Sequence, residues 1–264
     1  VTFAPRTMFI AELVLTYEDG RVEYIVSDDD WSCRMGAVRK QSIYNGETYY
    51  ARKELDAWST VNSSRAGWRT AQTVEAPDIK LRLKKCAPVR ITEERTPESL
   101  TLRKSKVIVD FGQNLVGNLR IRLRNTTRGQ KVVMRFAEML KADGALYVEN
   151  LRDAKATDVY VCKGADEEVY MPRFTFHGFR FAEIAGAGDE LTAEDLTACV
   201  MHNDLKKRGE FSCSDPLINQ LHRSITWGQR GNFFEAPTDC PQRDERLGWT
   251  GDAQIIAPTS MFHN

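Results

Sequence analysis

The chain has 264 residues, in which 37 Lys and Arg are balanced by 37 Asp and Glu. This length suits two or three domains rather than one. Zero net charge argues against a nucleic-acid partner, because phosphate binding rests on a surplus of Lys and Arg. No apolar run approaches the roughly 20 residues that a membrane-spanning helix needs. Composition leaves the oligomeric state and the compartment open, with a periplasmic or extracellular location slightly favoured over a cytoplasmic one.

The first two thirds of the chain have the pattern of β-strands. Residues 119–124 alternate strictly between apolar and basic side chains, which places the apolar set on one face of a sheet. Turn signals such as Arg128-Gly129 and Asp143-Gly144 separate this run from its neighbours. Many short strands at this spacing predict antiparallel β-sandwiches rather than βαβ units. Similar runs occur at Ile10–Tyr17, Val107–Phe111, Val132–Phe136, Asp158–Cys162 and Phe179–Ile184.

Two such blocks are predicted. The first is an N-terminal β-sandwich over residues 1–76, and the second is a β-sandwich over residues 99–188. A connector over residues 77–98, which contains Pro77, Pro88 and Pro97, joins them. Residues 189–264 form a linker and the start of a helical domain.

Helix signals appear only in this last part. Ser214-Asp-Pro216 combines a capping side chain with a proline at the first helical position. We expect a helix from about Pro216 to Arg230, with Leu217, Leu221 and Ile225 among the residues of one apolar stripe.

A second helix is expected to open at Gly251-Asp252, with Asp252 as its cap, and to run through Met261. Pro258 is expected to kink or shorten it.

Two helices cannot make a closed helical core, and an apolar stripe must be buried against something. Either these helices pack on the sandwich or most of a helical domain is missing from this chain, and we expect the second. The prediction that follows is that Leu217, Leu221 and Ile225 are exposed here, because the surface that would cover them is absent.

The segment Pro237–Asp252, between the two expected helices, carries the chemistry. It holds four carboxylates, Arg243, Arg246 and Trp249 in a long connection of a kind that is often functional. Cleavage of a glycosidic bond needs one carboxylic acid to protonate the leaving oxygen and a second carboxylate that acts on water or on the sugar. Asp and Arg bind vicinal hydroxyls, and a Trp face packs on a sugar ring. The alternative is a solvated loop of ion pairs with Trp249 in the core.

Several motifs resemble α-L-rhamnosidases of glycoside hydrolase family 78, in that family's domain order. The segment DCPQRDERLGWTGD (residues 239–252) is similar to the signature at the start of the family's (α/α)6 barrel. The segments DFGQNLVG (110–117), RFAE (135–138) with Asp143-Gly144, and PRFTFHGFR (172–180) resemble its second sandwich, and IYNGETYYAR (43–52) resembles its N-terminal sandwich. The resemblance implies two jelly-roll or concanavalin-like sandwiches followed by the first helices of the barrel.

The resemblance also implies an activity, the hydrolysis of terminal non-reducing α-L-rhamnosides with inversion. The general acid would be Glu245, four residues before Trp249 and seven before Asp252. Asp239, Arg243, Trp249 and Asp252 would bind the sugar. Because some relatives place Arg directly before the Glu, Asp244 is the alternative acid. The base is implied to lie beyond Asn264, so the chain alone is expected to be inactive.

Other polar residues are assigned structural roles. Asn45, Gly46 and Glu47 match a region where relatives bind sugar or calcium, but a turn at a strand end is the favoured interpretation. His177 is expected to hold a loop, and Glu138 and Asp143 to solvate a turn.

No metal and no cofactor are expected, because no His/Cys/Asp cluster has ligand spacing. The six cysteines form no CxxC pair and are interpreted as buried free thiols: Cys33, Cys86, Cys162, Cys199, Cys213 and Cys240.

The rival hypothesis is a non-catalytic carbohydrate-binding or structural module, with Trp31, Trp58 and Trp68 as a sugar platform.

Overall fold

The computed structural model describes residues 8–75, 78, 80, 82–188 and 190–263. The chain forms two compact units: residues 1–36 with 55–83, and residues 37–54 with 84–264. Pro77, in the expected connector, lies outside the described residues. Each unit is described by itself.

The first unit contains two small antiparallel pairs. Strands β1 (Glu12–Thr16) and β2 (Val22–Val26) form a hairpin, and β3 (Ser32–Cys33) pairs with β6 (Arg69–Thr70). The strand predicted around residues 10–17 is therefore confirmed. Its turn closes where the Gly20 N–H donates to the Tyr17 carbonyl at 2.9 Å.

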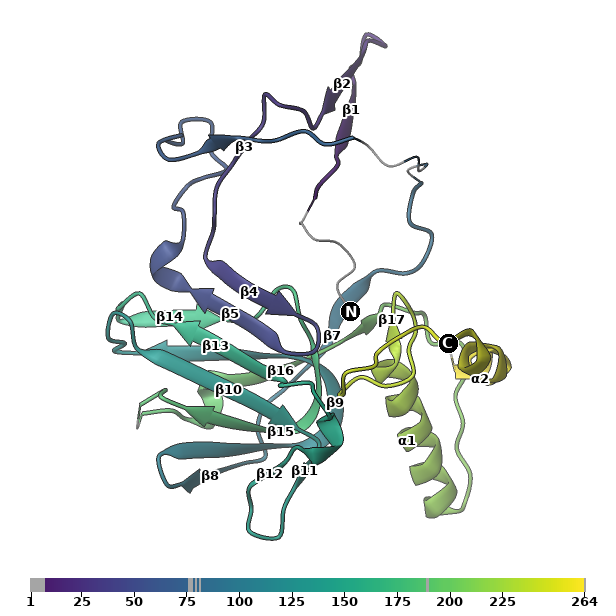
Figure 1. Ribbon diagram of the computed structural model, residues 1–264. Coiled ribbons are helices and arrows are strands. Elements are labelled where there is room, and N and C mark those ends of the chain that lie inside the picture. The colour runs from purple at the N-terminus through teal and green to yellow at the C-terminus, as the bar shows by residue number, and fades with distance from the viewer. Residues whose placement is uncertain (1–7, 76–77, 79, 81, 189, 264) are drawn as a thin grey trace. The chain divides into compact units, whose positions relative to one another are not determined.

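The second unit is built on one ten-stranded sheet (Figure 1). Neighbouring strands are antiparallel, except β5 and β13, which run parallel. The main path of the sheet is β4-β5-β13-β10-β15-β9-β16-β7, and β8 and β14 also pair with β9. Its strands are β4 (Val38–Ser42), β5 (Gly46–Tyr50), β7 (Val89–Arg95), β8 (Ser99–Arg103), β9 (Lys106–Arg124), β10 (Lys131–Ala137), β13 (Thr157–Val161), β14 (Glu167–Tyr170), β15 (His177–Ala185) and β16 (Leu196–Asn203).

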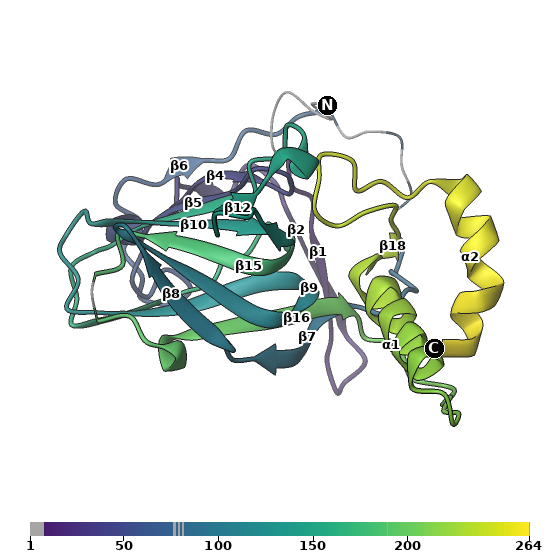
Figure 2. The ribbon, with the colours of Figure 1, turned by 90° about the horizontal axis from the view of Figure 1, so that it is seen from below.

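Strand β9 organises this sheet. Its 19 residues pair with β8, β14, β15 and β16 at different points along its length, so the sheet curls on itself (Figure 2). The two strands predicted at 107–111 and 119–124 are thus parts of one strand. At Gly117 the backbones come very close, since a Cβ added there would lie 1.9 Å from the Cys199 carbonyl oxygen.

The core fills the inside of the curl. The alternation predicted for residues 119–124 is confirmed, because Leu119, Ile121 and Leu123 are buried while the intervening arginines reach solvent. Apolar side chains from neighbouring strands complete the core, and the largest are Phe111, Phe136, Tyr160 and Phe179.

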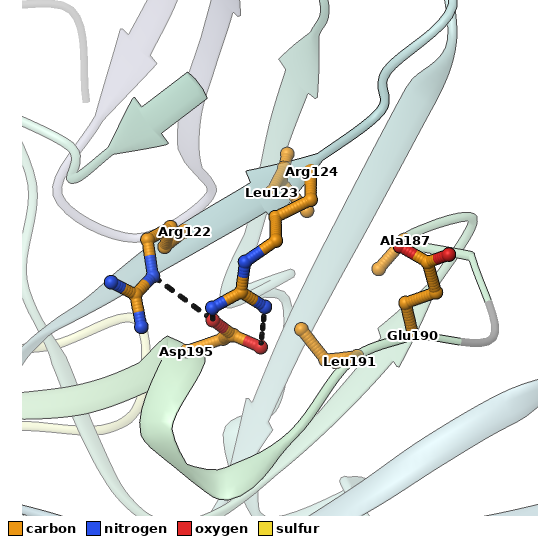
Figure 3. Close-up of a pocket in the computed structure, with 7 residues that line it drawn as sticks. All are labelled: Arg122, Leu123, Arg124, Ala187, Glu190, Leu191 and Asp195. Carbon is orange, nitrogen blue, oxygen red and sulfur yellow. Dashed lines mark hydrogen bonds and ion pairs between the residues drawn. The ribbon is translucent and has the colours of Figure 1, made fainter. Parts of the chain in front are cut away.

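A buried carboxylate fixes the entry to β16. Asp195 ends the short helix η3 (Ala193–Asp195), and its side chain is 1% exposed. It accepts hydrogen bonds from Arg122 and Arg124 of β9 (Figure 3). It also accepts from the backbone N–H and the hydroxyl of Thr192. These donors outweigh the effect of burial and lower the pKa of Asp195. The hollow beside β9 is thus occupied by an ion-pair network.

Short elements fill the remaining connections. They are η1 (Ala51–Lys53), the hairpin β11 (Met139–Leu140) and β12 (Leu146–Tyr147), and η2 (Glu149–Leu151). Strand β7 lies within the expected connector and β16 within the expected linker. The domain boundaries expected from the sequence stay predictions.

The two helices lie at the C-terminal end. Helix α1 (Pro216–Gly231) begins as predicted, with the Asp215 carboxylate accepting from the Leu217 N–H at 2.8 Å. Helix α2 (Thr250–His263) differs from the prediction in two ways. It begins before Asp252, which lies in the first turn instead of at the cap. It also continues past Pro258, because the helix is largely exposed and water can reach the carbonyl that proline leaves without a donor.

The exposed apolar stripe of α1 is confirmed, since Leu217, Leu221 and Ile225 are 78%, 59% and 42% exposed. Neither helix has the length and apolar content required to cross a membrane, as far as the described residues show. The mainly β fold, with sandwich-like sheet structure before two helices, is confirmed as well.

The cysteine prediction is half right. All six are free thiols, but only Cys162, Cys199 and Cys240 are buried. Cys33, Cys86 and Cys213 are exposed because they lie in the small first unit or in segments outside the curled sheet.

Candidate active site

The segment between α1 and α2 is closed into a loop by its own polar groups. A short hairpin of β17 (Phe233–Phe234) and β18 (Ala236–Pro237) leads into it. The Asp239 N–H then donates to the Leu247 carbonyl at 3.1 Å, and the Leu247 N–H donates to Asp239 Oδ1 at 2.8 Å. Residues 240–246 therefore form a loop whose two ends are joined.

A buried arginine fastens this loop to the sheet. Arg246 is 5% exposed, and its guanidinium donates to the carbonyls of Arg243 (2.9 Å), Gln242 (3.0 Å), Phe176 (2.8 Å) and Ile43. Two of these carbonyls belong to the loop and two belong to segments that adjoin β15 and β4. Burial lowers the pKa of Arg246 to about 10.

Aromatic contacts support the same attachment. The Tyr44 hydroxyl donates to the backbone carbonyl of Glu245 at 2.8 Å. Phe176 stacks on Phe234 with ring centroids 4.1 Å apart. At Gly178 an added Cβ would lie 3.0 Å from Pro241, so the loop packs directly on the start of β15. The curled sheet thus fixes the backbone on which Glu245 is carried.

The side chain of Glu245 lies in a cluster of charges and is 28% exposed. Its Oε2 accepts from Arg243 at 3.0 Å and from Arg152 at 3.2 Å. Arg243 also lies 4.0 Å from Asp239 Oδ2. The charges of Cys240, when ionised, and of Glu245 raise the pKa of Arg243 and keep it cationic. Three predicted site residues, Asp239, Arg243 and Glu245, are therefore brought together.

The other two predicted site residues are not joined to this cluster. Trp249 is 48% exposed, so the alternative that placed it in the core is wrong. Its backbone begins α2 by accepting from the Ala253 N–H. Asp252 is exposed in the first turn of α2. Within the described residues no hydrogen bond or ion pair links either side chain to Glu245.

The two adjacent carboxylates of the loop differ in their surroundings. Asp244 Oδ1 is buried and has no hydrogen-bond partner among the described residues. Glu245, by contrast, has its side chain partly exposed and oriented by arginines. The sequence alone could not distinguish the two in this way.

A metal ion is disfavoured at this cluster. Asp239, Cys240 and Glu245 can each bring one ligand atom within 4.8 Å of the others. However, the Arg243 guanidinium already lies beside both carboxylates, and its positive charge opposes a cation. Burial also raises the pKa of the Cys240 thiol, which disfavours the thiolate that a metal requires.

The residues assigned to structural roles lie inside the second unit. Glu47 is fully buried and accepts from the Tyr170 hydroxyl and from two backbone N–H groups, at Arg173 and Phe174. Burial is the largest influence on its pKa and raises it. The carboxylate is used internally, which supports the turn interpretation over a sugar or calcium site.

His177 is likewise buried, 3.1 Å from Asp158 of β13 and stacked on Phe136 of β10. Its role is structural, as expected, but it joins strands of the sheet instead of holding a loop. Glu138 accepts from Asn114 of β9 and Asn150 of η2 and so joins these two elements, whereas it was expected to solvate a turn. The difference arises because both amides come from other parts of the chain.

The proposed tryptophan platform of the first unit is not assembled in this structure. Trp31 and Trp58 are exposed and Trp68 is half-buried. Trp31 lies near Phe9, and Arg65 lies over Trp68. No ring contact among the three tryptophans occurs in the described part of this unit.

Three family models match successive parts of the chain. The α-L-rhamnosidase N-terminal domain matches residues 1–93, the bacterial α-L-rhamnosidase concanavalin-like domain matches residues 100–202, and the bacterial α-L-rhamnosidase 6 hairpin glycosidase domain matches residues 206–264. Together they account for nearly the whole chain in one domain order. The chain belongs to the bacterial α-L-rhamnosidase family.

Individual relatives agree with these matches. An α-L-rhamnosidase of Streptomyces avermitilis is 41% identical over 98% of the chain, and one of Alteromonas sp. is 41% identical over 96%. The chain covers 25% and 28% of those proteins, so it spans about a quarter of the curated relatives' length.

Two solved structures resemble the chain closely. The α-L-rhamnosidase of Dictyoglumus thermophilum superposes with a TM-score of 0.93 at 41% identity, over 96% of this chain and 29% of that one. The Streptomyces avermitilis enzyme, crystallised with L-rhamnose, gives 0.90 at 41% identity, over 95% of this chain and 24% of that one.

Three residues of the site escaped sequence reasoning. Tyr44 and Arg152 act on Glu245 from 201 and 93 residues away, and no spacing in a single sequence reveals such contacts. Arg246 stands in a run of charged residues, which is ordinarily a solvated surface. The only available signal for it was its place within the matched segment 239–252.

Proposed function

We propose that this chain is part of a longer glycosidase that removes terminal non-reducing α-L-rhamnose from glycosides with inversion of configuration. The observation that carries the proposal is the loop 239–247, which presents Glu245, Arg243 and Asp239 together at the start of the matched glycosidase domain. The relative crystallised with L-rhamnose supports a rhamnose-containing substrate.

Glu245 is proposed as the general acid. Its Oε2 is held by two arginines, whereas Oε1 makes no hydrogen bond among the described residues. A carboxylic acid oriented in this way can accept at Oε2 and still donate its proton from Oε1. Asp244 is the poorer candidate because one of its oxygens is buried without a partner.

The proposed reaction gives one proton to the leaving oxygen and takes one proton from water. The Glu245 proton passes to the glycosidic oxygen, and the bond from that oxygen to the anomeric carbon breaks with its electron pair going to the leaving alcohol. Water adds to the opposite face of the anomeric carbon and gives its proton to a second carboxylate, which inverting enzymes hold about 6.5–9.5 Å from the first. We place that base in a part of the protein beyond Asn264.

The remaining predicted site residues are proposed to bind the sugar. Asp239 and Arg243 would hold ring hydroxyls through paired hydrogen bonds. Trp249, exposed beside the loop, would cover the apolar face of the sugar. Asp252 would contribute from the first turn of α2. On this proposal the sandwich parts position the loop and the helical part supplies most of the substrate contacts.

The test is a pair of matched substitutions in the full-length protein. Glu245→Gln should lower kcat for p-nitrophenyl rhamnoside by about a hundredfold or more, since general acid catalysis contributes roughly 10² to 10⁴. An alkyl rhamnoside should suffer a larger loss, because its leaving group needs the proton more. Asp244→Asn is the control and should keep most of the activity.

Equal activity in Glu245→Gln together with a large loss in Asp244→Asn would transfer the acid to Asp244. Absence of rhamnoside hydrolysis by the unaltered full-length protein would overturn the proposed function itself.

A further inference from the structure

Arg152 contacts the active-site loop although it belongs to the preceding, concanavalin-like part of the chain. It directly follows η2, in the stretch between β12 and strand β13 of the curled sheet, where β12 belongs to the separate β11–β12 hairpin, and its guanidinium donates to Glu245 Oε2 at 3.2 Å. Figure 2 shows the connection that follows β12 next to the segment between α1 and α2. The concanavalin-like part of the chain thus places a cation on a carboxylate of the glycosidase part.

The backbone at Arg152 is unusual for a side chain of this size. Its φ is 55° and its ψ is −122°, in a region that favours glycine. The neighbours Leu151 and Ala154 are buried, and the Ala154 N–H donates to the Leu151 carbonyl at 3.1 Å. The turn is therefore fixed by its surroundings, and the arginine projects from it although glycine would be the less strained residue.

Both guanidinium groups bind the same oxygen of Glu245. Arg243 approaches Oε2 at 3.0 Å and Arg152 at 3.2 Å, which leaves Oε1 without a hydrogen bond among the described residues. The same Arg243 nitrogen that lies 3.0 Å from Glu245 also lies 4.0 Å from Asp239 Oδ2. Arg152 makes no other hydrogen bond through its side chain within the described part of the chain. Its side chain therefore serves Glu245 alone.

We propose that Arg152 is a positioning residue for Glu245, which keeps Oε2 turned inward and Oε1 turned toward the leaving oxygen of the substrate. The proposal rests on the function proposed above. When Glu245 gives up its proton, negative charge appears on the carboxylate, and the two cations stabilise that charge. Arg152 then acts most strongly on the step in which the glycosidic bond breaks.

The pH dependence of the rate should respond to the groups that face Glu245. They are Arg243 and Arg152 at Oε2, Asp239 behind Arg243, and the Cys240 thiol within 4.8 Å. Removing one of the two cations favours the protonated acid. The alkaline limb of the pH–rate profile should therefore move to higher pH when Arg152 is replaced.

The decisive variant is Arg152→Gly in the full-length protein. Glycine relieves the backbone strain, so the protein should fold and its melting temperature should not fall. In contrast, kcat should drop about tenfold to a hundredfold at nearly constant KM, in line with the loss of one preorganised donor. The drop should be larger for an alkyl than for a p-nitrophenyl rhamnoside. Arg152→Lys should recover part of kcat.

The matched control is Lys104→Gly. Lys104 has a similar positive φ of 56°, in the turn between β8 and β9, and among the described residues no hydrogen bond or ion pair joins its side chain to the loop 239–247. It should change neither kcat nor the pH profile. A stable Arg152→Gly protein with unchanged kcat and an unchanged alkaline limb would overturn the role of Arg152. Inactivity of the unaltered protein toward rhamnosides would instead refute the proposed function on which it rests.

Discussion

Replacing Arg246 with alanine should release the active-site loop from the curled sheet. Four backbone carbonyls have this guanidinium as their donor, and a buried acceptor left unsatisfied costs about 2 kcal/mol, or roughly 8 kcal/mol for four. Removing the charge also removes its burial penalty. The lowered pKa of Arg246, near 10, corresponds to roughly 3 kcal/mol of that penalty. The free energy that holds the loop on the sheet should therefore fall by about 5 kcal/mol, which raises the equilibrium constant for loop opening by about 4 × 10³.

Hydrogen exchange measures this opening directly. The amides of Asp239 and Leu247, which close the loop on each other, should have protection factors lower by up to about 4 × 10³ in Arg246→Ala. Arg246→Lys should lie between, because an ammonium has three donors but not the flat fork of the guanidinium. Arg223→Ala, on the exposed face of α1, is the control. Protection in Arg246→Ala within threefold of the unaltered protein would refute the reasoning.

Three further outcomes are expected. Burial raises the pKa of Glu168, but its hydrogen-bond donors outweigh burial and lower the pKa to about 2. The carboxylate should therefore contribute about 3 kcal/mol to the free energy of unfolding above pH 4.5, and this contribution is lost as pH falls through 2. In acid unfolding Glu168→Gln should lack this contribution, and an acid transition identical to that of the unaltered protein would contradict the prediction. Gly117→Ala should lower the free energy of unfolding by about 3 kcal/mol in urea, whereas Gly144→Ala, with open space around it, should cost about 1 kcal/mol. The 264-residue chain by itself should release no phenol from an aryl rhamnoside, and release that Glu245→Gln abolishes would show that the chain carries its own base.

Local patterns in the sequence predicted local structure well. The period of two in residues 119–124 and the Asp215-Pro216 helix start depend only on neighbours in the chain, and both are confirmed. The joining of two expected strands into β9 was missed, because residues 112–118 contain two glycines that resemble a turn. In the structure, Gly117 instead allows β16 to approach closely.

In the candidate site, too, contacts between sequence neighbours were predictable and contacts between distant segments were not. Asp239, Arg243 and Glu245 stand within seven residues, so their proximity could be predicted from the sequence. Arg152 and the clamp around Arg246 depend on contacts between distant segments, which a single sequence does not encode in any visible spacing. The relation of Trp249 to the acid stays a prediction.

Strands β4 and β5 are synthesised long before the segments that they contact in the folded protein. The ribosome releases these strands early. The Glu47 N–H donates to Asp158, which is synthesised 111 residues later, so β5 cannot pair with β13 until then. At roughly 5–20 residues per second, this wait lasts about 6–20 s. The Ile43 carbonyl waits longer still, since Arg246 follows 203 residues after it. During synthesis, β5 can pair with β4 but not yet with β13, so one edge of β5 stays open. A chaperone that protects this edge should raise the yield of correctly folded protein.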